Sequence, residues 1–416
     1  MKPFFLVFLL SCSFAFSQTR LELPPDFNER AFQHVQDLVS FGIRNAGTKS
    51  EKLTVDYLLD FYKDLHLDPR VDTFGFEYFS AKKISVKVDG RKFIYKRIYL
   101  DPYRNSHVLN GRTYCFTGAP AIVKSLADSM KGRIIFTDEL TEIYRLVRCR
   151  PLAIIIADEN DLKNLNNRPA RIDIDGQAEK KISYNISCSI GPEKEKQILL
   201  GAHWDSFCGP GADDNASGVS TIMELSRFFM AYKDSLHYSV RVVFFGAEEL
   251  GLLGSRAYAE KHIRDTASTI FYFNFDSVGD TGAILLDGMT GQKGKCLQPP
   301  AVQLTACRDF RNSWDLLDPD NNESLYESEI PGWLNKIFTN TLASTGHRYR
   351  KVNYCGSDHN SFANKGFITA HLGFDGNNVQ HCPADNISQV SKNSLELAGK
   401  IAAGVILGIN KVQDIN

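Results

Sequence analysis

The spacing of hydrophobic residues changes along the chain and divides it into regions of different predicted structure. In residues 27–41 and 49–65, apolar residues recur at helical spacing, so a helix is predicted in each segment. From residue 72 to residue 178 the pattern changes to short β-like runs separated by turns, which predicts a β-rich segment.

Beyond this segment, short hydrophobic runs alternate with stretches of helical periodicity. Strands are predicted near 183–190, 196–202, 239–246, 270–276 and 367–373, and helices near 216–231, 254–263, 331–345 and 391–411. This alternation favours an α/β fold with a mostly parallel central sheet flanked by helices. We therefore predict one α/β domain, formed by residues 18–71 and 179–416 and interrupted by a β-rich insert at 72–178.

The amino terminus has the pattern of a secretory signal peptide. Lys2 precedes a short apolar run, and the segment ends in a small-x-small pattern at Ser17. The run is too short for a transmembrane segment, which needs roughly 20 residues. We predict a signal peptide at residues 1–17 and an exported protein, periplasmic or extracellular. Acylation of Cys12 at a lipoprotein cleavage site remains an alternative, and it also implies export.

Composition is that of an ordinary globular enzyme, with 43% hydrophobic residues and a formal net charge of −1. This charge balance favours neither nucleic acid nor an anionic membrane as a partner. Of nine cysteines, Cys12 lies in the predicted signal peptide. Some disulfides are expected among the others in an oxidising compartment, but neither their pairing nor the oligomeric state follows from the sequence.

Residues able to bind a metal directly follow the hydrophobic runs of the α/β region. His203 and Asp205 follow one run, Asp213 opens a glycine-flanked loop before a helix, and Glu248 and Glu249 follow another run. In open α/β sheets the ligand crevice lies beyond the carboxyl ends of the strands, so these side chains should converge. Imidazoles and carboxylates suit zinc. The pattern therefore predicts a metallohydrolase.

The motifs around these residues, in their order along the chain, resemble the zinc aminopeptidases of peptidase family 28. The motifs are His203-Trp-Asp205, Gly211-Ala-Asp213-Asp-Asn-Ala-Ser-Gly218, Ala247-Glu248-Glu249-Leu-Gly251, Asn274-Phe-Asp276, Tyr354-Cys-Gly-Ser-Asp358-His359 and His381-Cys-Pro-Ala-Asp385. The resemblance covers about 183–411 and the two leading helices. The insert resembles a protease-associated domain at 131–136 and 151–156.

The resemblance implies a centre with two zinc ions per chain. Asp213 would bridge the ions, His203 and Asp276 would complete one site, and Glu249 and His381 would complete the other. Two cations about 3.5–4 Å apart can hold a bridging water, lower its pKa and polarise a peptide carbonyl.

The resemblance and the spacing also imply catalytic roles. Glu248 would act as general base for the bridging water and then as acid for the leaving amine. Asp205 would hydrogen-bond the His203 ring and fix its tautomer. Tyr354 would stabilise the oxyanion. His359 would lie near the site without binding zinc.

Other interpretations of the same residues stay open. Asp214 or Asn215 is expected to cap the following helix, which would leave Asp213 free for metal. A carboxypeptidase-like member of the family would need an arginine cluster, and the sequence does not place the candidates in space: Arg308, Arg311, Arg348 and Arg350.

Two further alternatives are a glutaminyl cyclase and a catalytically inactive binding homologue. Glutaminyl cyclases work with one zinc and typically lack the Glu-Glu pair and the first histidine, whereas this chain keeps Glu248, Glu249 and His203. Inactive relatives usually lose ligands. We therefore predict a secreted aminopeptidase with a peptide substrate, whose preferred amino-terminal side chain the sequence does not define.

Overall fold

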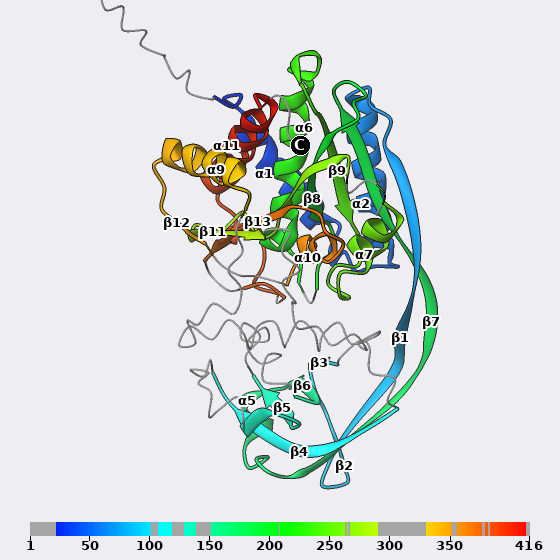
Figure 1. Cartoon of the computed structure of the whole chain (residues 1–416). Coiled ribbons are helices and arrows are strands. Elements are labelled where there is room, and N and C mark those ends of the chain that lie inside the picture. The colour runs from blue at the N-terminus through cyan, green and yellow to red at the C-terminus, as the bar shows by residue number, and fades with distance from the viewer. Residues whose placement is uncertain are drawn as a thin grey trace, which may run out of the picture.

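The structure is a computed structural model that describes residues 22–100, 107–118, 129–138, 151–207, 209–262, 264, 267–289, 330–351, 356–376, 379–381 and 383–412. Within these ranges the chain forms a helix-flanked sheet and a smaller β-rich lobe, connected by a long two-stranded ribbon (Figure 1). The predicted signal peptide, Cys12 and Tyr354 lie outside the described residues. Among the cysteines within them, Cys115 and Cys188 are free.

Four parallel strands form the centre of the sheet. They are β8 (Gln197–His203), β9 (Ser239–Phe245), β10 (Thr269–Phe275) and β13 (Thr369–Asp375), in the spatial order β13-β10-β8-β9. All four strands were predicted to within two residues at each end. Because they run parallel, their carboxyl ends lie at one edge of the sheet.

Antiparallel strands flank this centre on both sides. β7 (Pro169–Ile190) pairs antiparallel with β9, and β11 (Ala283–Met289) pairs antiparallel with β13. A short strand, β12 (Tyr349–Lys351), then pairs parallel with β11. The sequence pattern did not predict β11 or β12, so the sheet is wider and more mixed than expected.

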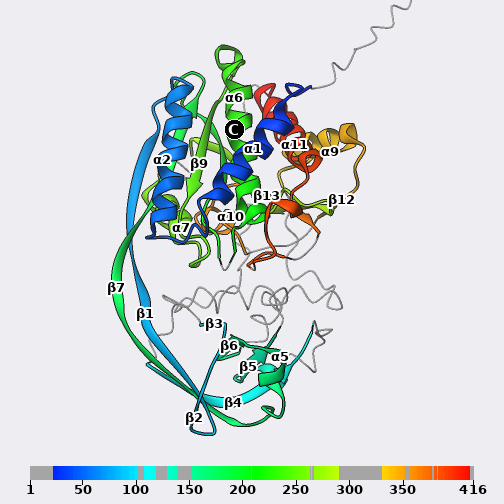
Figure 2. The same cartoon turned by 180° about the vertical axis from the view of Figure 1, so that it is seen from behind.

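Helices cover both faces of the sheet, as the alternation of side chains along β8 requires. Ile198 and Leu200 belong to the larger core, whereas Leu199 between them belongs to a second cluster on the opposite face. The larger core lies beneath a layer of five helices seen in Figure 2: α1 (Phe27–Ser40), α2 (Lys49–Asp64), α6 (Gly218–Met230), α9 (Gly332–Thr345) and α11 (Lys392–Asn410).

The opposite face carries α7 (Leu253–Lys261) and α10 (His359–Ala363), which contact one another. Both helices contribute aromatic side chains, Tyr258 and Phe362, to the second cluster. The predicted helices of the α/β region are thus confirmed, and α10 is an addition. None of the helices in the described ranges is long and apolar enough to cross a membrane.

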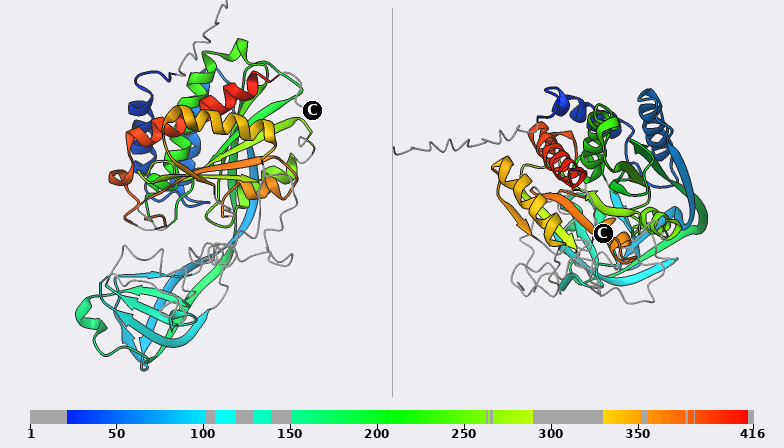
Figure 3. Two further views of the ribbon diagram at one scale, coloured as in Figure 1. Left: turned by 60° about the vertical axis from the view of Figure 1, so that its left-hand side comes forward. Right: turned by 45° about the horizontal axis from the view of Figure 1, so that its top comes forward.

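The ribbon is formed by β1 (Arg70–Val88) and the amino-terminal part of β7, paired antiparallel. Asn185 of β7 pairs with Phe245, the last residue of β9. The part of β7 before Asn185 therefore extends past the edge at which the parallel strands end, and Figure 3 shows the lobe set apart at the end of this ribbon.

The lobe has its own hydrophobic core, which includes Val86, Ile134, Ile155 and Ile172. Its other elements are β2 (Arg91–Phe93), β3 (Arg97–Tyr99), β4 (Val108–Phe116), β5 (Ile134–Thr137), β6 (Ala153–Ile156) and α5 (Glu159–Leu162). Residues 72 and 178, the predicted boundaries of the insert, fall inside the continuous strands β1 and β7. The likeness to a protease-associated domain stays a prediction.

Candidate metal centre

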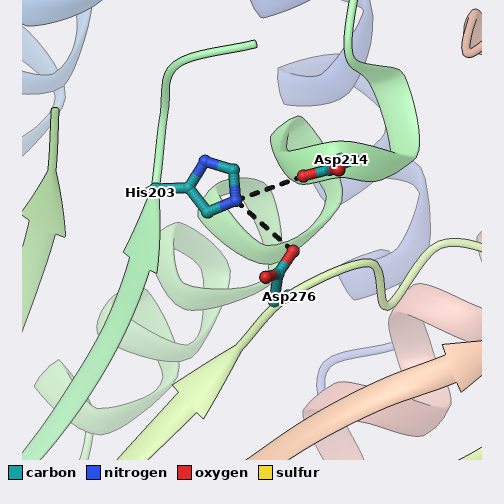
Figure 4. Close-up of side chains that lie close together, drawn as sticks. All are labelled: His203, Asp214 and Asp276. Atoms are coloured by element: carbon teal, nitrogen blue, oxygen red, sulfur yellow. Dashed lines mark hydrogen bonds and ion pairs between the residues drawn. The ribbon is translucent and has the colours of Figure 1, made fainter. Parts of the chain in front are cut away.

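The first histidine of the predicted site lies at the carboxyl end of β8, among three carboxylates. The Nε2 atom of His203 is 3.2 Å from Oδ1 of Asp214 and 3.4 Å from Oδ1 of Asp276, as Figure 4 shows. It is also 3.9 Å from Oε2 of Glu248. Asp276 directly follows β10, the neighbour of β8, so the parallel register of the two strands brings their end residues together.

The second histidine approaches the same aspartate from its other side. The Nε2 atom of His381 is 3.2 Å from Oδ2 of Asp214 and 2.9 Å from Oε2 of Glu249. Asp214 therefore presents one carboxylate oxygen to His203 and the other to His381. This is the geometry expected of a carboxylate that joins two adjacent metal positions.

Asp213, which the sequence interpretation expected to bridge two ions, does not face the two histidines, because Asp214 lies between them instead. The Oδ1 atom of Asp213 instead accepts a hydrogen bond of 2.7 Å from the backbone N–H of Gly279. Asn215 provides the predicted helix cap, since its Oδ1 accepts the N–H of Gly218 at 3.0 Å.

The backbone explains the difference. Asp214 (φ −108°, ψ 92°) and Asn215 (φ −137°, ψ 45°) are not helical, although they lie within the turn that leads into α6. Neither helical nor strand periodicity therefore predicts which of two adjacent aspartates points toward the histidines.

A chain of hydrogen bonds fixes the orientation of Asp276. Its Oδ2 accepts a hydrogen bond of 2.7 Å from the hydroxyl of Ser357. The Ser357 hydroxyl in turn accepts a hydrogen bond of 2.8 Å from the side-chain amide of Asn274. Both partners belong to motifs quoted from the sequence, but no role had been inferred for either.

Asp205 supports both His203 and the Glu-Glu turn. Its carboxylate accepts the backbone N–H groups of Glu248 at 3.0 Å and Glu249 at 3.1 Å. The Nδ1 atom of His203 lies 3.4 Å from Oδ1 of Asp205 and 3.2 Å from its backbone carbonyl oxygen. The predicted contact with the imidazole is therefore present, and the hydrogen bonds to the turn are an additional finding.

Glu248 and Glu249 differ in what surrounds them. Glu249 is 2.9 Å from His381, whereas the nearest ion-pair partner of Glu248 is His203 at 3.9 Å. One oxygen of each glutamate, Oε1, is buried with no hydrogen-bond partner among the described residues. Such buried, unpaired carboxylate oxygens are costly unless a cation or a water molecule satisfies them.

Burial and mutual proximity shift the acid–base equilibria of these groups. Burial raises the pKa of Glu249 to about 7, even though His381 opposes the shift. Burial alone would lower the pKa of His203, but the surrounding carboxylates, chiefly Glu248 and Asp276, outweigh it and raise that pKa well above its ordinary value. The cluster thus concentrates negative charge that a bound cation would compensate.

The donor set fits zinc. Three groups of side chains, found among the described residues, have ligand atoms within 4.8 Å of one another. They are His203, Asp214 and Asp276; His203, Glu248 and Glu249; and Asp214, Glu249 and His381. Imidazole nitrogens and carboxylate oxygens are ordinary zinc ligands, and a site of this kind leaves room for a water molecule or substrate.

His359 is buried and does not belong to these three groups. Its ring lies against that of His371, with a centroid distance of 5.0 Å. Of the arginines considered for a carboxypeptidase-like site, Arg348 is exposed and Arg350 pairs with Asp375 on the surface. Arg308 and Arg311 lie outside the described residues.

Fold and site together define an α/β protein with a candidate dinuclear metal centre at the carboxyl edge of its parallel strands. Residues 185–406 match the model of Peptidase family M28, and the chain belongs to this family. The family resemblance found in the sequence is thereby confirmed.

Two curated relatives have aminopeptidase names. A probable leucine aminopeptidase 2 of Aspergillus fumigatus is 32% identical over 28% of this chain and 24% of its own length. A probable lipoprotein aminopeptidase of Mycobacterium tuberculosis is 26% identical over 59% of this chain and 57% of its own. The matched part of the chain thus spans from a quarter to just over half the length of these relatives.

Solved structures share the fold over nearly the whole chain. A zinc aminopeptidase from Bacillus subtilis is 20% identical with a TM-score of 0.64, covering 95% of this chain and 98% of that one. A glutaminyl cyclase from Porphyromonas gingivalis is 17% identical with a TM-score of 0.50, covering 91% of this chain and 97% of that one. Identities this low establish the fold alone.

Proposed function

We propose that this protein is an aminopeptidase that uses two zinc ions. The observation that carries the proposal is the position of Asp214, whose two oxygens face His203 and His381. Each imidazole has a second carboxylate beside it, Asp276 for His203 and Glu249 for His381. The names of the two curated relatives and the zinc aminopeptidase with the same fold agree with this proposal.

In this proposal Asp214 would hold both ions. His203 and Asp276 would complete one site, and His381 and Glu249 would complete the other. When bound, two zinc ions would lower the pKa of a water molecule and polarise the scissile carbonyl. Asp205 and Ser357 keep His203 and Asp276 oriented through the hydrogen bonds described above.

Glu248 is the general base in this mechanism. It is buried beside Glu249 and has an oxygen with no partner among the described residues, so that oxygen is available to accept a proton from the attacking water. The same carboxyl group would then donate the proton to the leaving amine. Asp205 holds the backbone of Glu248 and so fixes the direction of its side chain. Stabilisation of the oxyanion by Tyr354 stays a prediction.

The direction of cleavage follows from local charge. An aminopeptidase must recognise a free α-ammonium group, and the centre is rich in buried carboxylates. The net charge of the chain is −1, so no long-range steering of a cationic substrate is expected. The attraction is therefore local, and the motifs contain no dedicated group for a substrate carboxylate.

Metal analysis of the purified protein tests the centre. We expect close to two zinc ions per chain, loss of activity on chelation, and recovery with zinc or cobalt. A reproducible stoichiometry of one in fully active protein would favour a glutaminyl cyclase. Activity that survives exhaustive chelation would exclude a metallohydrolase.

A comparison of kcat/KM for one short peptide in free, amino-terminally acetylated and carboxyl-terminally amidated forms tests the direction of cleavage. Acetylation should abolish hydrolysis, and amidation should change it little. Loss on amidation with tolerance of acetylation would indicate a carboxypeptidase, and release of pyroglutamate from a peptide that begins with Gln would indicate the cyclase.

Export is part of the proposal and has its own test. The pattern at residues 1–17 supports a signal peptide, and one curated relative is named as a probable lipoprotein aminopeptidase. Mass spectrometry of the mature amino terminus distinguishes two outcomes, a start at Gln18 after cleavage and an acylated Cys12. An intact Met1 on protein from its natural host would contradict both.

A further inference from the structure

Arg44, in the loop between α1 and α2, is a fully buried charged residue that the mechanism above does not use. Its exposed fraction is 0%, and it is among the largest fully buried side chains. A guanidinium group is expensive to bury unless its N–H groups are hydrogen-bonded. The partners of Arg44 therefore indicate what it does.

All of the hydrogen bonds recorded for the Arg44 guanidinium go to backbone carbonyl oxygens. Nε donates to Trp204 at 2.7 Å, and Nη2 donates to Gly211 at 2.9 Å. Nη1 donates to Pro210 and, at 3.5 Å, to Leu38. The carbonyls of Trp204, Pro210 and Gly211 belong to the segment between the first histidine and the bridging aspartate.

The backbone of Arg44 holds the same segment. Its N–H donates to the hydroxyl of Ser206 at 3.1 Å, and that hydroxyl donates to the carbonyl of Gly209 at 3.0 Å. The packing around Gly211 is tight, because a Cβ atom added there would lie 2.4 Å from Cβ of Ser206 and 2.3 Å from the carbonyl oxygen of Asp214. Arg44 and this tight packing thus hold Trp204, Ser206 and Gly211 in place.

The positive charge of Arg44 also suits this position. The carboxylates that interact with it electrostatically include Asp205 and Asp385. Asp205 accepts the backbone N–H of Glu249, and Asp385 accepts the backbone N–H of Asp214. Burial lowers the pKa of Arg44 to about 10, which still leaves the group charged at neutral pH.

We propose that Arg44 is a positioning residue for the metal centre, holding Trp204 and Gly211 so that the adjacent His203 and the nearby Asp214 can bind the same zinc ion. Trp204 directly follows His203, and Gly211 begins the turn that contains Asp214. One planar guanidinium therefore links two segments that each supply a ligand, and it does so without contacting substrate. This inference rests on the metal centre proposed above.

A purely structural arginine would behave differently. Its loss would lower the stability of the metal-free and the zinc-loaded protein by the same amount and leave zinc affinity unchanged. Loss of a positioning residue lowers zinc affinity itself, so the increase in melting temperature on adding zinc becomes smaller. Zinc affinity therefore separates the two roles.

The test compares Arg44→Lys with Glu224→Gln, measuring zinc dissociation constants by competition with a chelator and Tm with and without zinc. Lysine keeps the positive charge but lacks the planar guanidinium group, whose N–H donors point in fixed directions. Glu224 is a matched control, because it is buried on α6 and pairs with Arg30 and His34 of α1. We expect Arg44→Lys to weaken zinc binding about 10–100-fold, as loss of supporting hydrogen bonds does in other metal sites, and Glu224→Gln to leave it unchanged.

Zinc affinity in Arg44→Lys equal to that of the wild type would overturn the inference, even if its Tm were lower. If Arg44→Lys does not fold, Ser206→Ala tests the same connection, with a several-fold loss of affinity expected and an unchanged affinity contradicting it. A wild-type protein that binds no zinc would instead refute the proposed centre, so the two failures are distinguishable.

Discussion

Asp205 and Asp385 support two different turns of the candidate centre in the same way. The carboxylate of Asp205 accepts the consecutive backbone N–H groups of Glu248 and Glu249, and that of Asp385 accepts those of Asp213 and Asp214, at 2.7 and 3.0 Å. Each turn carries one of the proposed ligands. A carboxylate is suited to this task because both of its oxygens accept hydrogen bonds.

The first prediction is that Asp205→Asn and Asp385→Asn each weaken zinc binding. An amide has one accepting oxygen, so one backbone N–H of the turn would face an NH₂ group instead. Loss of such support typically costs 10–100-fold in metal affinity. Competition with a chelator measures the effect, with Asp173→Asn on the surface of the lobe as control. Wild-type affinity in both site variants would show that the backbone bonds do not position the ligands.

The second prediction separates the two adjacent aspartates. Asp214→Asn should abolish binding of at least one zinc ion, because both carboxylate oxygens of Asp214 face an imidazole. Asp213→Asn should retain both ions, since an Asn oxygen can still accept the N–H of Gly279. Zinc content per chain after gel filtration is the measurement. The reverse result would restore Asp213 as the bridging ligand.

The sequence was a good guide to the fold where hydrophobic periodicity is strong. The parallel strands are buried on both faces and appear as continuous apolar runs, and their helices are amphipathic. The ribbon was not predicted as one unit. In its middle, residues such as Lys180 are exposed, so the hydrophobic pattern is weaker there although β1 and β7 continue.

The candidate site was predictable to the level of segments but not of every side chain. His203, Glu249 and Asp276 lie at or just beyond the carboxyl ends of buried strands, so their convergence follows from the topology. Asp214 lies in a non-helical turn, where no period assigns a direction to its side chain. Arg44 reaches the site only through tertiary packing of a distant loop, which leaves no local pattern in the sequence.

The third prediction assigns different roles to the two glutamates. Glu248→Gln should keep both zinc ions and lower kcat by about 10²–10⁴, the usual contribution of a general base. Glu249→Gln should lose zinc affinity, because its carboxylate lies 2.9 Å from His381 where a ligand is needed. Zinc content and kcat measured on the same preparations decide the matter. Loss of zinc in Glu248→Gln with retention in Glu249→Gln would reverse the two roles.

Glu51 provides a pH effect that is independent of the metal ligands. This buried side chain on α2 accepts hydrogen bonds from the backbone N–H of Gly47, at 2.6 Å, and from the hydroxyl of Ser183. Burial raises its pKa to about 7, with these hydrogen bonds opposing the shift. The ordinary value of about 4.5 applies to the unfolded chain.

The fourth prediction is that Glu51 makes the wild type less stable as pH rises. Between pH 4.5 and 7 the folded state holds the Glu51 proton more tightly than the unfolded state, so its contribution is fully present below about 4.5 and is lost as pH rises through about 7. Glu51→Gln has no such proton. Its free energy of unfolding should therefore increase relative to that of the wild type by up to about 3 kcal/mol across this window. Urea denaturation of both metal-free proteins from pH 4.5 to 8 measures the difference, in which the titration of all other groups largely cancels. A difference that stays constant with pH would mean that Glu51 is ionised throughout, with its two hydrogen bonds compensating fully for burial.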